Sequence, residues 1–286
     1  MAPAPSGYCN LRGGPLGQHN RPLQGKAVVI TRAPEQSREF ADALEGLGAR
    51  VLQLPMICFA PSEDPAKLDA VLARLADFDW VLFTSQNAVR FFFRRSCRLD
   101  AAKLSHASGL RFAAIGAATA QAARNLDIRI DYVATVQTGE GFATELKTAM
   151  SGSRVLLPRS DRADDRLPAA LRSAGAVVDE VVVYRTAMPE SFDSAVIGEV
   201  KDGSANVIVF ASPSAFDNFL GVIGAEEVKR LAEKKTQLAA IGPTTARAIR
   251  AAGLPVAIES DESSPVKMAA AIAEYYEKSA VTTRNS

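Results

Sequence analysis

Short apolar runs alternate along the chain with segments whose apolar residues recur at helical spacing. Residues 27–32 begin with apolar side chains and predict a strand, residues 34–47 predict a helix, and residues 50–54 predict a second strand. Gly48 stands where the helix should end, because glycine readily adopts the left-handed backbone that closes helices. Alternation of this kind predicts parallel strands joined by helices, and therefore an α/β fold.

The same order of elements recurs 127 residues later, where Arg159 corresponds to Arg32. Residues 155–159 predict a strand, residues 167–173 a helix and residues 177–183 another strand. The stop signal of the first helix, Gly-Ala, is also repeated after the second.

Two later blocks extend the repeat. Residues 80–85 match residues 207–212, each an apolar run ending in serine, and residues 113–116 match residues 239–242 after the loss of one residue. Agreement over separated blocks indicates an internal duplication. Each copy supplies enough strands for a flavodoxin-like parallel sheet.

Two extended segments look like crossings between domains, residues 52–61 and their counterpart, residues 180–188. We therefore expect an outer α/β domain of residues 24–57 plus 185–280 and an inner α/β domain of residues 58–184. A tandem split near residue 150 is the alternative. Residues 1–23 contain several prolines and glycines and no acidic residue, which predicts a disordered tail; an organellar transit peptide is the other interpretation.

Composition excludes several kinds of partner and chemistry. The chain has 33 Lys and Arg against 32 Asp and Glu, whereas general nucleic-acid binders usually carry a basic excess. No uncharged apolar run reaches the length of about 20 residues that a membrane helix requires. The three cysteines, Cys9, Cys58 and Cys97, show no paired spacing, as is typical of a reducing cytoplasm. With only His19 and His106, a Ser-His-Asp triad or a histidine-based metal site has too few parts.

Hydroxyl groups and glycines gather where four predicted strands end. In open α/β sheets, ligands bind at the carboxyl ends of the strands, where helix N-termini present free amides. Helix capping alone would explain each of these residues, but four sets on corresponding strands favour a two-sided cleft that binds anions. Neither a Walker loop nor a GxGxxG motif occurs. The candidate binding residues are Thr84, Ser85, Thr119, Ser212, Ser214, Gly242, Thr244 and Thr245.

Two arginines and one tyrosine complete the candidate site. Arg32 and Arg159 occupy matched strand ends, so they are better candidates for anion contacts than the other arginines, for which a solvated surface role is expected. Tyr184 lies in the second crossing, beside Arg185, where the first copy has Ile57. Tyr184 is either a packed strand aromatic or a hydroxyl that faces the cleft.

Two other clusters favour structural roles. Asp161, Asp164 and Asp165 are interspersed with arginines, which predicts a salt-linked loop rather than a metal site. Residues 91–93 are three consecutive phenylalanines on a predicted helix, and we expect them to belong to the core.

Four blocks together resemble the uroporphyrinogen-III synthase family: residues 83–89, 183–186, 210–214 and 240–246, within a match that runs over residues 26–276. The resemblance implies two flavodoxin-like domains joined by a two-stranded β linker. It implies a lyase of heme biosynthesis that closes hydroxymethylbilane, a linear tetrapyrrole, to uroporphyrinogen III, with loss of water and inversion of the last ring. No cofactor is implied.

The resemblance also implies roles for single residues. Tyr184 matches the family's tyrosine and would assist departure of the substrate hydroxyl, while the strand-end hydroxyls would grip carboxylates. Gln86 and Asn87 replace a proline-containing turn that is common in relatives. We expect a cytoplasmic monomer with no nucleic-acid or membrane partner. The alternatives are a non-catalytic two-lobed module of the same fold that binds small anions or regulates, and a two-lobed periplasmic-type receptor.

Overall fold

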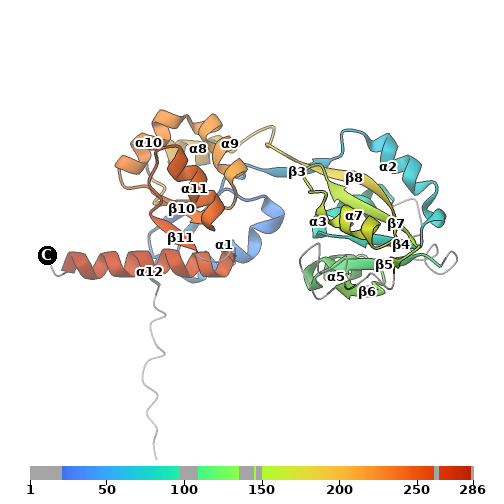
Figure 1. Ribbon diagram of the computed structural model, residues 1–286. Helices are drawn as coiled ribbons and strands as arrows, with labels where there is room; N and C mark the ends of the chain where they lie inside the picture. The colour runs from blue at the N-terminus through green and yellow to red at the C-terminus, as the bar shows by residue number, and fades with distance from the viewer. Residues whose placement is uncertain (1–20, 97–108, 135–144, 146–149, 261–263, 285–286) are drawn as a thin grey trace, which may run out of the picture. The chain divides into compact units, whose positions relative to one another are not determined.

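The computed structural model describes residues 21–96, 109–134, 145, 150–260 and 264–284, without the side chains of residues 280–284. The chain divides into two compact units (Figure 1). Unit 1 runs up to Met56 and resumes at Ser191, and unit 2 is Ile57–Glu190. Unit 2 is therefore continuous in sequence, whereas unit 1 is assembled from two separate segments.

Unit 1 contains a five-stranded parallel sheet in the order β11-β10-β9-β1-β2. Every residue of the two central strands, β1 and β9, is apolar and buried, as expected where helices cover both faces. The strands are β1 (Ala27–Ile30), β2 (Arg50–Gln53), β9 (Val207–Phe210), β10 (Gln237–Ile241) and β11 (Ile258–Ser260). The helices are the 3-10 turn η1 (Pro34–Gln36), α1 (Arg38–Gly46), α8 (Ser194–Lys201), α9 (Pro213–Ile223), α10 (Ala225–Glu233), α11 (Pro243–Ala251) and α12 (Pro265–Arg284).

Successive side chains of these strands point to opposite helical layers. On one face, Val28 of β1 belongs to a core that includes Phe40 of α1 and Ile272 of α12. On the other face, the ring centroid of Phe210 at the end of β9 lies 5.2 Å from that of Phe219 on α9. Both faces of the sheet are thus closed by packed helices.

The described part of unit 1 includes the end of the predicted tail. Leu23 is fully buried, and its backbone N–H donates to the Leu47 carbonyl at 3.0 Å. Its side chain belongs to the same core as Val28 and Phe40. Residues 1–20 of the predicted tail lie outside the described residues.

Unit 2 contains a six-stranded sheet in the order β3-β8-β7-β4-β5-β6, parallel except for β3. The strands are β3 (Cys58–Pro61), β4 (Trp80–Phe83), β5 (Arg111–Ile115), β6 (Tyr132–Ala134), β7 (Arg154–Ser160) and β8 (Val177–Ala187). The helices are α2 (Pro65–Leu72), the 3-10 turn η2 (Leu75–Asp77), α3 (Gln86–Arg95), α5 (Ala117–Arg124) and α7 (Arg166–Ser173).

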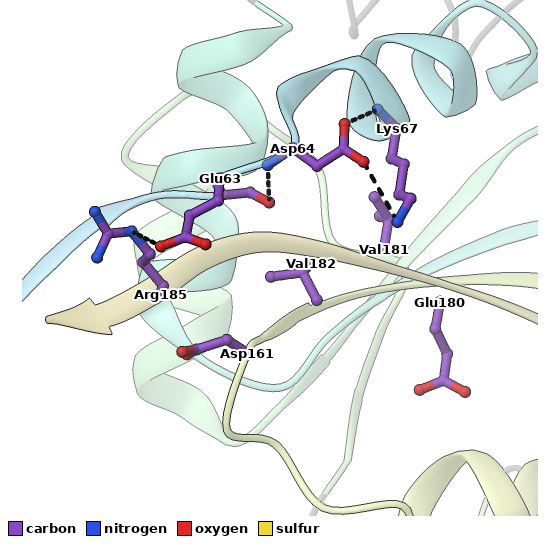
Figure 2. Close-up of a pocket in the computed structure, with 9 residues that line it drawn as sticks. Glu63, Asp64, Lys67, Asp161, Glu180, Val181, Val182 and Arg185 are labelled. Atoms are coloured by element: carbon purple, nitrogen blue, oxygen red, sulfur yellow. Dashed lines mark hydrogen bonds and ion pairs between the residues drawn. The ribbon is translucent and has the colours of Figure 1, made fainter.

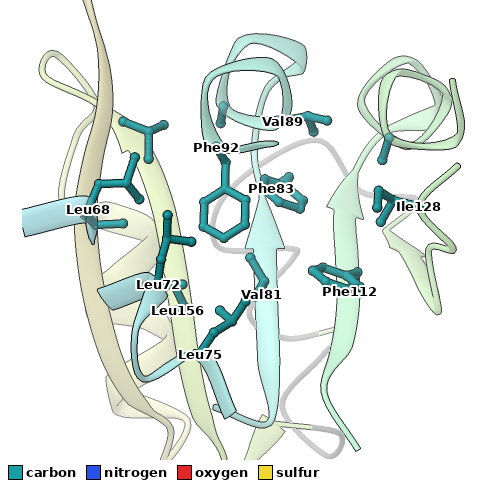
Figure 3. Packing of buried hydrophobic residues seen from close by; sticks show 14 of the residues in the cluster. Leu68, Leu72, Leu75, Val81, Phe83, Val89, Phe92, Phe112, Ile128 and Leu156 are labelled. Atoms are coloured by element: carbon teal, nitrogen blue, oxygen red, sulfur yellow. The ribbon is translucent and has the colours of Figure 1, made fainter. Parts of the chain in front are cut away.

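Figure 3 shows the larger core of unit 2, which joins α2, α3 and α5 to one face of the sheet. Phe83 of β4 is fully buried at its centre, with its ring centroid 5.5 Å from that of Phe92 on α3. Leu167 and Leu171 of α7 pack on the opposite face. The phenylalanines at 91–93 take the expected core role: Phe92 is fully buried and its two neighbours pack against this cluster.

Each sheet combines strands of both sequence copies. β1 and β2 of the first copy share a sheet with β9–β11 of the second, where β1 pairs with β9, and β7 and β8 of the second copy share a sheet with β3–β6 of the first. The predicted two-domain α/β fold with parallel sheets is confirmed. A split near residue 150 would separate β1 and β2 from β9, with which they share a sheet.

β8 joins the predicted strand, residues 177–183, to the predicted crossing, residues 180–188, in one continuous strand. Its end pairs antiparallel with β3, in the register Tyr184 to Pro61 and Ala187 to Cys58. The domain boundary that we expected between residues 184 and 185 falls inside this strand. Arg185 and the two residues after it pair with β3 and therefore belong to the sheet of unit 2. The antiparallel pair belongs to unit 2, and its role as a linker stays a prediction.

The burial of Leu23 gives a first prediction. Leu23→Ala should lower the free energy of unfolding by about 2–5 kcal/mol, because it leaves a cavity in a closed core. Gln24→Ala, at the exposed neighbouring position, should change it by less than about 0.5 kcal/mol. Urea denaturation of both variants measures the difference. Equal stabilities would show that Leu23 is not an anchor of unit 1.

Candidate functional site

The predicted site residues form one set in each unit, at the carboxyl ends of parallel strands. In unit 2, Thr84 and Ser85 follow β4 and Tyr184 lies near the end of β8. In unit 1, Arg32 follows β1 and Ser212 follows β9. In both sheets this edge is where open α/β folds bind ligands.

Ser85 and Tyr184, 99 residues apart in sequence, meet at this edge of unit 2. Ser85 Oγ lies 3.2 Å from the Tyr184 hydroxyl oxygen, and the geometry allows either group to donate. Ser85 Oγ also accepts a hydrogen bond of 3.0 Å from the Ala88 N–H and thereby caps the N-terminus of α3. The cap fixes the serine hydroxyl, and the serine in turn fixes the phenol.

Two aromatic rings hold the ring of Tyr184, which is 8% exposed. Phe91 of α3 stacks on it with centroids 5.5 Å apart and an interplanar angle of 17°. Phe59 of β3 meets it edge-on at 5.7 Å and 81°. The sequence singles out neither ring as a partner of Tyr184. If the two predicted crossings are paired antiparallel, with Pro61 opposite Tyr184, Phe59 lies diagonally across from Tyr184. This pairing is the signal that could have identified Phe59.

The threonines of α5 and α11 are more enclosed than the serines. Thr119 and Thr245 are 5% and 2% exposed, each in the first turn of its helix. Gly116 and Gly242 precede these helices with φ of 79° and 88°, a conformation that only glycine adopts readily. The two glycines therefore allow the abrupt turn from strand to helix.

In unit 1, the end of β9 carries a serine cap like that of β4. Ser212 Oγ accepts a hydrogen bond of 3.2 Å from the Ala215 N–H at the N-terminus of α9. Ser214 is half-buried in the first turn, and Thr244 is exposed in the first turn of α11. These residues occupy strand ends of unit 1, separate from the Ser85–Tyr184 pair of unit 2.

Arg159 is enclosed within unit 2. Its side chain is 9% exposed and forms an ion pair with Glu180 of β8. Its guanidinium also donates to the carbonyls of Ala163 and Asp164, the latter at 2.8 Å, and lies 3.3 Å from Asp165 Oδ1. The arginine thus holds the loop between β7 and α7, and its predicted substrate contact stays a prediction.

The same loop is salt-linked, as its composition predicts. Asp164 and Arg166 form an ion pair of 2.7 Å, and the hydrogen bond from Arg166 lowers the pKa of Asp164 to about 2. Asp161 Oδ1 accepts a hydrogen bond of 3.1 Å from the Thr186 N–H of β8. Among the residues that the structure describes, no group of three or more His, Cys, Asp or Glu is placed to hold a metal ion.

Arg32 lies in a different environment in unit 1. It is half-buried, and its guanidinium donates to Gln36 Oε1 at 3.4 Å. Burial lowers the pKa of Arg32, while the negative charge of Glu39 acts in the opposite direction. Within the described ranges, no carboxylate is in ion-pair distance of its guanidinium. Arg32 therefore has donors that a bound anion could use.

A separate pocket of about 420 Å³ lies along β8 of unit 2, and Figure 2 shows the side chains that line it. Four lining residues are acidic and two, Lys67 and Arg185, are basic. Arg185 Nε lies 3.5 Å from Glu63 Oε1 and Lys67 Nζ lies 3.3 Å from Asp64 Oδ2. Tyr184 and the strand-end serines are not among its lining residues. With this excess of acidic groups, the pocket is unsuited to an anionic ligand.

No helix in the described part of the chain combines the length and apolar character needed to cross a membrane.

Comparison with known proteins identifies relatives over nearly the whole described chain. The family model described as uroporphyrinogen-III synthase HemD matches residues 38–270. A candidate uroporphyrinogen-III synthase of Methanothermobacter thermautotrophicus is 33% identical over 251 residues, covering 86% of this chain and 97% of that protein. The uroporphyrinogen-III synthase of Synechococcus elongatus is 30% identical over 234 residues, covering 79% of this chain and 86% of that protein.

Solved structures agree on the fold. Uroporphyrinogen-III synthetase of Helicobacter pylori aligns with a TM-score of 0.53 and 19% identity, over 90% of this chain and 99% of that one. A mutant uroporphyrinogen III synthase of Thermus thermophilus aligns with a TM-score of 0.51 and 20% identity, over 88% and 99% of the two chains. At these identities the likeness concerns the fold alone.

The two serine caps give a matched prediction. Ser212→Ala should cost about 0.5–2 kcal/mol of stability, since it removes one helix cap. Ser85→Ala removes a cap and also the hydrogen bond to Tyr184, which should add about 0.5–1.5 kcal/mol. Denaturation curves of the two variants measure the gap. A smaller loss for Ser85→Ala than for Ser212→Ala would contradict a stabilising Ser85–Tyr184 bond.

Proposed function

The chain belongs to the uroporphyrinogen-III synthase family, and on that premise we propose that it converts hydroxymethylbilane to uroporphyrinogen III in heme biosynthesis. The matched region, residues 38–270, includes parts of both units and every strand-end residue of the candidate site except Arg32. In this reaction the terminal C–O bond breaks, the hydroxyl leaves as water, and the ring closes with the last pyrrole inverted. A proton taken up at the hydroxyl is released again at closure, so no net acid or base is consumed.

The hydrogen bond between Ser85 and Tyr184 is the observation that carries the catalytic proposal. A hydroxyl is a poor leaving group until it accepts a proton, and a phenol can donate one. We assign Tyr184 as the proton donor to the departing hydroxyl, directly or through water. Phe59 and Phe91 support this role because they restrict the ring to one position.

Binding of the substrate's acetate and propionate groups is the second part of the proposal. The N-termini of α3, α9 and α11 lie at the strand ends with serine, threonine or glycine beside them, and such termini favour anions. The proposed carboxylate contacts are Thr84, Ser85, Ser212, Ser214, Gly242 and Thr244. Thr119 and Thr245 are included among the proposed contacts because of the family resemblance, although both are buried and other residues of their helices are more exposed.

Much of the rate enhancement in this proposal is positional. Once water has left, the reactive azafulvene carbon must bond to the substituted ring position of the last pyrrole. Bonding to the free ring position would give the type I product instead. Binding of several carboxylates would restrict the substrate to that geometry, and good orientation alone can contribute about 7–11 kcal/mol to lowering a barrier. Dehydration and closure involve no change of oxidation state, so the chemistry as written requires no redox cofactor.

The proposal extends to the setting of the enzyme. The three cysteines lack paired spacing, which supports a cytoplasmic setting, and we further propose that the protein is a monomer. Size-exclusion chromatography with light scattering tests the monomer directly.

The activity itself is tested by isomer analysis. Purified protein is supplied with freshly prepared hydroxymethylbilane, and the products are oxidised and separated by chromatography. The proposed function predicts the type III isomer. Type I product alone, at the rate of spontaneous closure, would instead indicate a non-catalytic module of the same fold.

Tyr184→Phe tests the assigned proton donor. Loss of one acid catalyst should lower kcat by about 10²–10⁴-fold, while the ring and its contacts with Phe59 and Phe91 remain. Tyr132→Phe is the matched control. Tyr132 lies on β6 of the same unit, where its hydroxyl donates to Glu145 at 2.6 Å, so this variant should leave kcat unchanged. An unaltered kcat for a folded Tyr184→Phe variant would remove Tyr184 from the mechanism.

A further inference from the structure

The two arginines at matched strand ends have different partners. Arg159 forms its ion pair with Glu180 of β8, and Glu180 is paired with Leu157 in the register of β7 and β8. In unit 1, Ile30 and Gln53 occupy these two positions, and they are paired in the same register. Gln53 therefore stands where unit 2 has the carboxylate that binds the arginine.

The carboxylate at position 180 is fully engaged. Glu180 Oε1 accepts a hydrogen bond of 2.8 Å from Arg172 of α7, while Oε2 binds Arg159. Arg159 Nη2 donates to two carbonyls of the loop after β7. A buried, charge-paired guanidinium of this kind gains little from a further anion, because its charge is already compensated.

Arg32 lacks this compensation. Position 53 is a neutral, exposed glutamine, and Gln36 provides only an uncharged acceptor at 3.4 Å. The charge of Glu39 acts on Arg32, but within the described residues it forms no ion pair with it. A half-buried cation without a counter-ion has lost part of its hydration, so an arriving carboxylate stabilises it strongly.

The position of Arg32 in the sheet is suited to a ligand. β1 lies between β2 and β9, at the point where the order of the strands reverses. Thr31 holds the end of β1 to β9, because its hydroxyl donates to the Val209 carbonyl at 2.7 Å. Arg32 and the Ser212 cap consequently flank the crevice where open α/β sheets bind ligands.

We propose that Arg32, and not its duplicate Arg159, binds a substrate carboxylate. In this proposal Glu180 makes Arg159 unavailable to the substrate, whereas the neutral Gln53 leaves Arg32 available. The inference rests on the proposed function only in that the ligand is a polycarboxylate. It predicts that one substitution in unit 1, Gln53→Glu, recreates the internal ion pair of unit 2 and makes Arg32 unavailable.

The experiment compares Gln53→Glu, Arg32→Gln and the double variant. Each should raise KM for hydroxymethylbilane about 10- to 100-fold, the effect of losing one charge-assisted hydrogen bond, with kcat within about twofold. The double variant should lose less than the sum of the two single losses in binding free energy, since both changes remove the same contact. Uroporphyrin III, the oxidised product, is the probe for affinity in a fluorescence titration that needs no turnover.

Two control variants separate a local effect from a change in net charge. Gln24→Glu adds an exposed carboxylate and Arg50→Gln removes an arginine that is ion-paired with Glu199 at 2.5 Å. Both lie in unit 1 at the start of its strands rather than at their carboxyl ends. Each should leave KM and the affinity for uroporphyrin III unchanged, and melting curves establish that all five variants are folded.

The outcomes distinguish this inference from the proposed function. Wild-type affinity for uroporphyrin III in both Gln53→Glu and Arg32→Gln would overturn the inference, whatever the activity. An additive loss in the double variant would also overturn it, because Gln53→Glu would then act elsewhere. If the wild type yields only type I product, the proposed function fails, while the porphyrin titration still tests Arg32.

Discussion

The pairing of β1 with β9, and of β4 with β7, is the interaction on which the rest of the molecule depends. Val28 pairs with Val207 in one sheet and Trp80 with Val155 in the other. Each pair joins a strand of one sequence copy to a strand of the other, so neither copy can form its own sheet in this arrangement. Because the paired strands are parallel, their carboxyl ends lie at one edge, and the residues that follow them become neighbours.

The duplicated frame matters chemically where its copies differ. At one matched position Tyr184 replaces Ile57, and it gains a hydroxyl that a capped serine and two aromatic rings hold in place. At another, Glu180 replaces Gln53 and turns an arginine inward to stabilise a loop. In the proposed mechanism the first difference supplies a proton donor in unit 2, and in the proposed substrate binding the second leaves a cation available in unit 1. On these proposals, a duplicated fold supports a reaction in which the two ends of the substrate need different treatment.

Local patterns predict those features that depend on neighbours in sequence. The apolar runs of β1, β4 and β9 and the serine caps of α3 and α9 follow from periodicity and from side chains that bond their own helix. The contacts of Tyr184 do not follow, because Phe91 reaches it only when α3 packs over β8. The inward turn of Arg159 depends on the register of β7 against β8, which includes an irregularity between Arg159 and Ser160. Such features are set by packing between elements distant in sequence, which no single segment encodes.

The division of unit 1 into two segments has a consequence for synthesis on the ribosome. The Thr31 hydroxyl bonds the Val209 carbonyl, 178 positions further along the chain, so the first two strands are made long before their partner. At the usual rate of synthesis this delay is about 10–35 s. Unit 2 is continuous and can fold during that interval, while the apolar strand β1 still lacks its neighbour β9 and has an open edge. We therefore expect the early part of unit 1 to need protection from aggregation until residues 207–210 have been made.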